Sequence, residues 1–177
     1  MLNFFTAASI VLLFISCSNQ VSEPLAKKTF RSDSLHFSIQ YPNHWEVKER
    51  EGKIKTIGLF ESLQSPEDAY QENIVIWREE IPIPIPDSLY AKAARAEIKI
   101  TNPSLTLIEE QPRKIGNHLF YPFHFNFITK DSNAYTVYGY TTLQKTHGYN
   151  ISATTAGDQA KFQQMVESIL ASFTHIP

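Results

Sequence analysis

The chain has very little of the residues on which several common chemistries depend. Its single cysteine, Cys17, lies near the start of the 177 residues, so the chain beyond it carries no thiol. Disulfides, thiolate zinc sites and a cysteine nucleophile are therefore excluded from that part. Six glycines are spread along the chain, and none of them builds the glycine-rich loop that cradles a phosphate group.

An excess of charge of one sign is lacking as well. The chain has 16 Lys and Arg residues against 18 Asp and Glu residues, which gives a formal net charge of −2. No basic stripe is present, and the aromatic residues are not interleaved with Lys or Arg, so we expect no nucleic-acid partner. What the chain does have is aromatic residues: 12 Phe, 8 Tyr and 2 Trp can supply the core of one domain.

The region around Cys17 indicates where in the cell the protein is located. The cysteine follows an apolar run at residues 10–15, which is too short to span a bilayer as a stable helix. The segment Phe14-Ile15-Ser16-Cys17 resembles a bacterial lipobox, although Met1-Leu2-Asn3 carries no basic side chain. We expect residues 1–16 to be a lipoprotein signal peptide. An ordinary signal peptide cleaved nearby, or a short N-terminal anchor, would also fit the run.

On the lipobox interpretation, Cys17 carries palmitate and further acyl chains, because one chain anchors a protein only marginally. The residue after it is Ser18, not the Asp that holds enterobacterial lipoproteins at the inner membrane. By analogy, we expect a lipoprotein anchored in the outer membrane and facing the periplasm.

The rest of the chain divides into a tether and a single domain. Residues 17–30 are polar and without pattern, which is typical of a flexible tether. Residues 31–177 are long enough for one domain with its own core. Within the domain, short and often alternating apolar runs predict strands at residues 35–41, 45–47, 54–60, 73–77, 105–110, 118–127, 134–145 and 149–155.

Two helices are predicted between and after these strands. The first follows the Ile-Pro segment at residues 81–86, which cannot be an interior strand because alternate residues lack an N–H donor. Asp87 or Ser88 should cap this helix, and one of its faces gathers four apolar residues: Leu89, Ala93, Ala96 and Ile100. The second helix begins near Asp158 and has a longer apolar face: Phe162, Met165, Val166, Ile169, Leu170 and Phe173.

These elements predict an α+β fold, a mainly antiparallel sheet flanked by helices. The segment at residues 37–45, Phe-Ser-Ile-Gln-Tyr-Pro-Asn-His-Trp, is similar to the opening motif of PsbP-like domains. The segment at residues 169–173, Ile-Leu-Ala-Ser-Phe, is similar to the end of their last helix. The resemblance implies the fold shared by PsbP and Mog proteins, a family that includes photosystem II extrinsic proteins, nuclear-transport factors and many bacterial lipoproteins.

Six histidines raise the question of a metal site. No two of them have the H-x-H or H-x-x-x-H spacing that places two imidazoles on one ion. His118 and His124 share a strand face but lie ~20 Å apart, because a strand rises 3.3–3.4 Å per residue. We expect no metal and no cofactor, with the histidines solvated or hydrogen-bonded; ligation by His124 would need partners on adjacent strands. Trp45, after a turn, is expected in the core.

Catalytic constellations are missing from the sequence too. It has no G-x-S-x-G nucleophile elbow. Its adjacent carboxylates, Glu79-Glu80 and Glu109-Glu110, would point to opposite faces of a strand and cannot act as an acid–base pair. The sequence therefore predicts a protein that is not an enzyme.

The best candidate for a binding surface is a sheet face with polar and aromatic side chains at alternate positions. It is formed by His124, Asn126, Tyr138, Tyr140 and Thr142, with Ser152 and Thr154 on the next strand. These side chains could line a shallow groove, but a solvated outer face or the polar fringe of a helix-covered face explains the same pattern. The Ile-Pro segment with Trp77 is a second candidate, as an extended ligand for a partner protein.

The function expected from these features is that of a non-catalytic, lipid-anchored envelope protein, a binding or accessory module for a protein complex. Its partners would be the membrane, through the N-terminal lipid, and an envelope protein. Two alternatives stay open: a small-ligand carrier, which an apolar cavity between sheet and helices would support, and a weak metal-assisted hydrolase built on His124.

Overall fold

The structure is a computed structural model that describes residues 26–50, 54–63, 70–130 and 132–176. Its helices are α1 (Asp87–Thr101) and α2 (Gln159–Leu170). Its strands are β1 (Lys27–Ser32), β2 (Phe37–Pro42), β3 (Trp45–Arg50), β4 (Thr56–Glu61), β5 (Asn73–Glu80), β6 (Ile108–Glu109), β7 (Arg113–Ile115), β8 (His118–Ile128), β9 (Ala134–Gln144), β10 (His147–Thr155) and β11 (Thr174–His175). Cys17 and the expected signal peptide lie outside the described residues.

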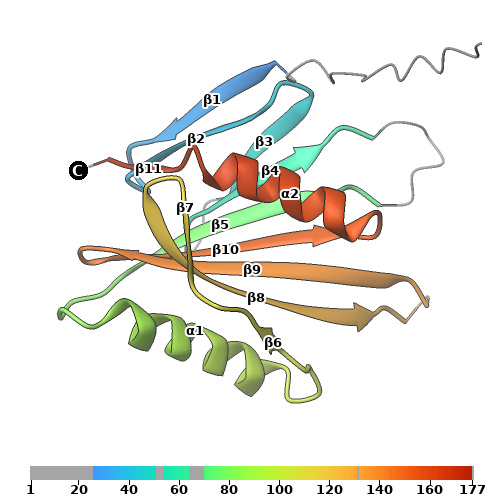
Figure 1. Cartoon of the computed structure of the whole chain (residues 1–177). Coiled ribbons are helices and arrows are strands. Elements are labelled where there is room, and N and C mark those ends of the chain that lie inside the picture. The colour runs from blue at the N-terminus through green and yellow to red at the C-terminus, as the bar shows by residue number, and fades with distance from the viewer. Residues whose placement is uncertain (1–25, 51–53, 64–69, 131, 177) are drawn as a thin grey trace, which may run out of the picture.

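The strands form two antiparallel sheets (Figure 1). The small sheet has the order β1-β2-β11, and the large sheet has the order β3-β4-β5-β10-β9-β8-β6, with β7 also paired to β8. α2 and the small sheet cover one face of the large sheet, while α1 lies against the other face (Figure 1). The predicted α+β fold, a mainly antiparallel sheet flanked by helices, is confirmed.

Most predicted strands are present, and the differences are at short edge strands. The run at residues 105–110 yields only the two-residue β6, because pairing with β8 starts at Ile108. β1, β7 and β11 were not predicted, and β1 occupies residues 27–30 of the expected tether. β1 is an edge strand with mostly exposed polar side chains, so it lacks the alternation that marks a half-buried strand.

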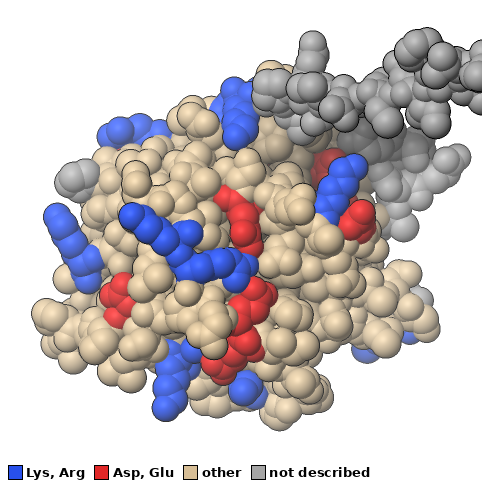
Figure 2. Space-filling view, viewed as in Figure 1, with Lys and Arg blue, Asp and Glu red and all other residues tan. Residues whose placement is uncertain are grey.

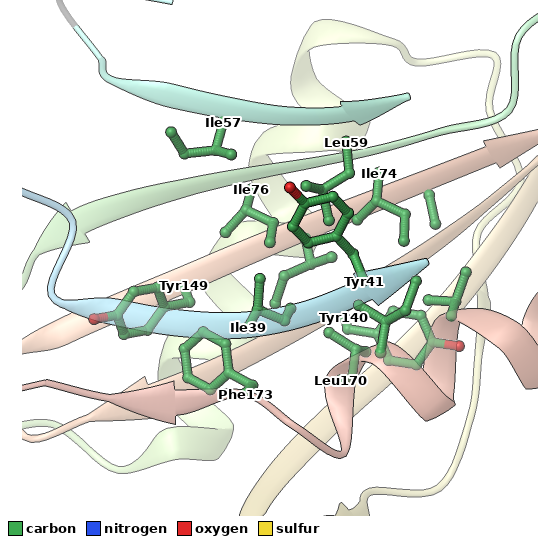
Figure 3. Packing of buried hydrophobic residues seen from close by; sticks show 14 of the residues in the cluster. Ile39, Tyr41, Ile57, Leu59, Ile74, Ile76, Tyr140, Tyr149, Leu170 and Phe173 are labelled. Carbon is green, nitrogen blue, oxygen red and sulfur yellow. The ribbon is translucent and has the colours of Figure 1, made fainter. Parts of the chain in front are cut away.

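The face of the large sheet under α2 is a closed hydrophobic core. Phe162, Val166 and Ile169 of α2 are buried there, as the helical spacing predicts. Asp158 caps this helix by accepting a hydrogen bond from the Lys161 backbone N–H at 3.1 Å. Figure 3 shows how side chains from β2, the large sheet and the C-terminal segment interlock: Ile39, Tyr41, Ile57, Leu59, Ile74, Ile76, Tyr149, Leu170 and Phe173.

Trp45 belongs to the same core, with only 2% of its surface exposed. It follows the turn after Pro42, itself buried at the end of β2. The core role predicted for this tryptophan is confirmed.

The predicted apolar face of α1 is wrong. Leu89 and Ile100 are 51% and 77% exposed, while the residues turned toward the sheet are Tyr90, Ala91, Ala94 and Ile98. Small side chains let this helix approach the sheet, and Tyr90 reaches Asn150 of β10 with its hydroxyl. The predicted cap is also wrong: the N-cap residue is Pro86, and no side chain caps the helix.

Charged side chains of both signs share the surface. On the face seen in Figure 2, acidic side chains gather near the middle beside basic ones, and further Lys and Arg side chains are scattered around them. No helix within the described residues is long and apolar enough to cross a membrane.

Candidate binding cleft

The residues of the predicted binding surface lie on one face of β8 and β9, but that face is covered. His124 is paired with Tyr138, and Asn126 with Thr136. Tyr138, Tyr140 and Thr142 are 6%, 1% and 1% exposed, and the two tyrosines contact α2, so only the two β8 side chains reach the surface. The arrangement is the polar fringe of a helix-covered face.

Ser152 and Thr154 do not share that face, which corrects the predicted grouping. In β10, Ile151 and Ala153 are the residues that pair with Tyr140 and Tyr138 and enter the core. Because strand side chains alternate, Ser152 and Thr154 point to the opposite side of the sheet. The sequence pattern alone did not fix the register of β10 against β9.

The tyrosines on the covered face hold α2 in place. Tyr138 donates to the Gln159 backbone carbonyl at 3.3 Å, and Tyr140 donates to Glu167 Oε1 at 3.3 Å. Burial, followed by the charge of Glu167, raises the pKa of Tyr140 well above its ordinary value. Both hydroxyls therefore remain protonated donors near neutral pH.

His124 belongs to an ion-pair network that joins three parts of the fold. Its Nδ1 lies 3.2 Å from Glu110 Oε1, and Glu110 Oε2 accepts from Arg113 at 2.6 Å. Arg113 also donates to Glu167 of α2 at 2.5 Å. Burial raises the pKa of Glu110, but hydrogen bonds from Arg113 and His124 and their charges outweigh it, so the pKa lies below its ordinary value.

This network has the geometry of a structural clamp. His124 meets a carboxylate that is already paired with a guanidinium, and Asn126 accepts from Thr136 at 2.8 Å. Among the described residues, no three His, Cys, Asp or Glu side chains are arranged to hold a metal ion.

Three histidines that lie far apart in the sequence meet at one end of the sheets. His147 Nδ1 lies 3.0 Å from His175 Nε2, and the His36 ring stacks on His147 with 4.9 Å between centroids. Burial lowers the pKa of both His147 and His175. The charge of Arg78 lowers the pKa of His147 further, and the charge of His147 lowers that of His175. This contact ties β11 and the turn before β2 to β10.

The opposite face of the large sheet carries a cleft that the sequence analysis did not place. The cleft lies between α1 and strands β5, β8, β9 and β10, and its volume is about 610 Å³. Ligand sites for small molecules commonly have volumes of 300–1,000 Å³. Its walls are mostly apolar and aromatic, from the sheet and from α1: Trp77, Phe123, Phe125, Phe127, Val137 and Ile98.

Local sequence explains why this face is aromatic and yet open. The phenylalanines at 123, 125 and 127 occupy alternate positions of β8, so they line one side together. Gly139 of β9 lies under Phe123: a Cβ atom there would come within 2.0 Å of the ring. Across the cleft, Ala94 of α1 is too short to fill the space.

One part of the cleft is polar and acidic. Asn150 is 5% exposed; its Nδ2 donates to Glu79 Oε1 at 2.8 Å and to the Tyr90 hydroxyl at 2.7 Å. Burial raises the pKa of Glu79, and the charge of Glu97 on α1 raises it further, while hydrogen bonds from Trp77 and Asn150 oppose the rise. Among the described residues that line this cleft, none is Lys or Arg.

A second, smaller hollow of about 380 Å³ lies between the β2–β3 turn and α2. Its lining mixes acidic and basic side chains, including Glu72, Asp158 and Lys161. The larger cleft is the better candidate site because its lining is more apolar and its charge is of one sign.

Two signals in the sequence point to the larger cleft. The alternating phenylalanines at 123, 125 and 127 share a face with Trp77 of β5, and α1 opposes them with alanines. Sequence reasoning chose the polar face of β8, because polar and aromatic side chains at alternate positions resemble a groove. An apolar strand face usually indicates core, so these rings were not recognised as a site.

Comparison with known proteins decides the family. The family described as PsbP-like protein matches residues 14–175. The chain belongs to the PsbP-like family. No curated protein sequence matches this PsbP-like chain.

Solved structures share its fold at low sequence identity. CyanoP, the cyanobacterial PsbP of Synechocystis sp. PCC 6803, is 12% identical, with a TM-score of 0.62; the match covers 88% of this chain and 95% of CyanoP. LpqN of Mycobacterium tuberculosis, involved in cell envelope biogenesis, is 13% identical, with a TM-score of 0.61 and coverage of 89% and 88%. A Bacteroides thetaiotaomicron VPI-5482 protein is 22% identical, with a TM-score of 0.55 over 85% of this chain. The match spans only 48% of the Bacteroides protein.

Proposed function

We propose that this PsbP-like protein is a lipid-anchored binding module that works at the cell envelope without catalysing a reaction. The observation that carries the binding role is the cleft beneath α1, whose aromatic lining offers contact area. Among the described residues that line it there is no His or Cys, and no group of three His, Cys, Asp or Glu side chains in the described part of the chain could hold a metal ion. The similarity of the fold to a protein involved in envelope biogenesis supports the location. The lipobox-like segment ending at Cys17 supports the anchor.

The anchor is tested by metabolic labelling with a palmitate analogue. The parent protein should take up the label and sediment with outer membranes, and Cys17→Ala should lose both properties. Label retained in Cys17→Ala contradicts the anchor. Sedimentation with the inner membrane contradicts only the proposed outer-membrane location.

The non-catalytic role is tested by a screen against esters, phosphoesters, peptides and glycosides. The chain from residue 18 onward contains every described element, and it should turn over none of these substrates. His124→Ala is the matched variant, because His124 is the residue on which a hydrolase would be built. Activity that this variant abolishes would overturn the proposal.

The cleft favours one specific form of this function, a carrier of a small ligand. The volume of about 610 Å³ and the lining by three phenylalanines and Trp77 fit an apolar molecule better than a protein segment with many backbone groups. Ala94→Phe should fill the cleft from α1, and Ala93→Phe, at an exposed neighbouring position, is its control. Mass spectrometry of the protein purified from membranes should find a bound small molecule with the parent and Ala93→Phe, and none with Ala94→Phe.

A further inference from the structure

We infer that the cleft between α1 and the large sheet binds a small amphiphilic cation: a molecule with an apolar body and a protonated amine. This inference deepens the carrier function and rests on it. It is carried by two features that occur together in the cleft: an aromatic wall, and a set of described lining residues that includes acidic side chains and no basic ones.

The aromatic wall selects the body of the ligand. Phe125 and Phe127 are half-buried and Phe123 is 4% exposed, so the rings present their surfaces to the cleft without leaving the sheet. Removing an aliphatic or aromatic body from water against such rings is favourable in proportion to the apolar area buried. The wall itself carries no charge and cannot choose between head groups.

The acidic side chains select the head group. Glu79 of β5 and Glu97 of α1 both line the cleft, and the charge of Glu97 acts on the Glu79 carboxylate. Asn150 fixes Glu79 through a 2.8 Å hydrogen bond, so this carboxylate is held in position before a ligand arrives. A protonated amine would place its positive charge between two carboxylates.

Two arginines that lie near these carboxylates along the chain have partners outside the cleft. Arg95 of α1 is 13% exposed and pairs with Glu109 at 3.2 Å. Arg78, beside Glu79 in β5, belongs to the other face of the sheet and pairs with Glu80 at 3.1 Å. A ligand cation would therefore supply a partner that the lining of the cleft does not.

Burial and the Glu97 charge already raise the pKa of Glu79, so the ionised carboxylate is less favourable in the fold than in water. An anionic ligand would add to this repulsion, and a neutral one would leave it unchanged. A cation relieves it, and the negative faces of Trp77 and the phenylalanines attract the same charge.

The experiment compares three ligands that share one apolar body: octylammonium, octan-1-ol and octanoate. Each is titrated below its micelle concentration into the chain from residue 18 onward. Trp77 fluorescence is the signal, since Trp77 lines the cleft and Trp45 is buried in the opposite core. We expect octylammonium to bind about tenfold or more tightly than octanoate, which corresponds to at least about 1.4 kcal/mol, with octan-1-ol between them.

Glu97→Gln is the charge variant, because Glu97 is exposed and its loss leaves the Asn150–Glu79 contact in place. It should weaken octylammonium binding, strengthen octanoate binding and leave octan-1-ol unchanged. Glu49→Gln, on the exposed end of β3 and outside the cleft, is the matched control and should change none of the three. Ala94→Phe should abolish binding of all three ligands, and Ala93→Phe should not.

The outcomes separate this inference from the carrier function. Octanoate binding as tightly as octylammonium, with Ala94→Phe still blocking both, would overturn the cationic preference and leave the carrier function standing. Affinities for octylammonium and octanoate that do not change in Glu97→Gln would have the same meaning. Failure of all three ligands to bind would overturn both proposals.

Discussion

Both faces of the large sheet carry aromatic and aliphatic side chains, yet only the face under α2 and the small sheet is closed. Under α2 and the small sheet, rings and branched side chains interlock into a core whose members are almost wholly buried. Under α1, the short side chain of Ala94 faces the same cleft as the phenylalanines of β8 and leaves it unfilled. The apolar pattern of a strand determines which of its side chains face inward. The size of the side chains on the covering helix then determines whether that face of the sheet becomes a packed core or an open cleft.

The largest expected difference between the faces is the cost of shortening a helix side chain. Ile169→Ala removes a 2% exposed side chain from α2 and should lower the free energy of unfolding by about 2–5 kcal/mol. Ile98→Ala, on the half-buried face of α1, should cost about 1 kcal/mol because that side chain borders a cleft. Urea unfolding of both variants measures this, and equal losses would contradict the comparison.

The ion-pair network on the closed face should come next. Arg113→Ala leaves Glu110 and Glu167 without their shared partner and should cost about 1–3 kcal/mol, the usual range for hydrogen bonds to charged groups. Lys48→Ala is the control, because Lys48 and its partner Glu46 are 57% and 60% exposed. Exposed ion pairs contribute about 0–1 kcal/mol to the free energy of unfolding. If Arg113→Ala costs no more than this, the network does not stabilise the fold more than an exposed pair does.

Gly139 of β9 makes room for the Phe123 ring on the open face beneath α1. Gly139→Ala places a methyl group against the Phe123 ring and should cost about 1–3 kcal/mol through overpacking, with the ring displaced into the cleft. Gly157→Ala is the matched control, since its nearest neighbour would be Glu72 Oε1 at 3.3 Å and no left-handed backbone is required there. In Gly139→Ala the thermal unfolding midpoint should fall and octan-1-ol should bind more weakly, whereas Gly157→Ala should change neither quantity.

We expect the weakest effect to be the loss of stability in acid that comes from the histidine cluster. The folded pKa values of His147 and His175 lie below the ordinary value of 6.5, so the fold disfavours their protonation. Their contribution to stability is present above pH 6.5 and is lost as the pH falls through the lowered folded values. His175→Gln should therefore reduce the acid sensitivity of the unfolding midpoint below pH 6.5. An unchanged acid sensitivity in His175→Gln would show that the cluster does not couple folding to pH.

The sequence predicted the structure correctly where the residue pattern within a single helix or strand was sufficient. The spacing of Phe162, Val166 and Ile169 predicted the buried face of α2, because a helix buries one stripe whatever lies opposite. The alternation from His118 to Phe127 predicted β8. The motif that ends at Trp45 and the closing segment at residues 169–173 pointed to the PsbP-like fold.

The sequence was a poor guide wherever two elements had to be matched. The face of α1 was predicted from the helical spacing of four residues: Leu89, Ala93, Ala96 and Ile100. The contact with the sheet is made instead by Tyr90, Ala91 and Ala94. The cleft depends on how α1 is placed against β8 and β9, and no periodicity within either element encodes that distance. The binding roles expected for His124, Asn126, Tyr138, Tyr140 and Thr142 stay predictions, although the last three of these side chains are buried.

Enlarging one alanine on each face of the large sheet tests whether the face beneath α1 is open while the face beneath α2 is closed. Ala153→Phe acts on β10 inside the closed core, where the side chain is 0% exposed; it should cost about 3 kcal/mol or more, or prevent folding. Ala94→Phe acts on α1 at the cleft and should leave the free energy of unfolding within about 1 kcal/mol of the parent, because the ring has a space to occupy. If Ala94→Phe destabilises the protein as much as Ala153→Phe in urea unfolding, the face beneath α1 is packed core and the cleft does not exist.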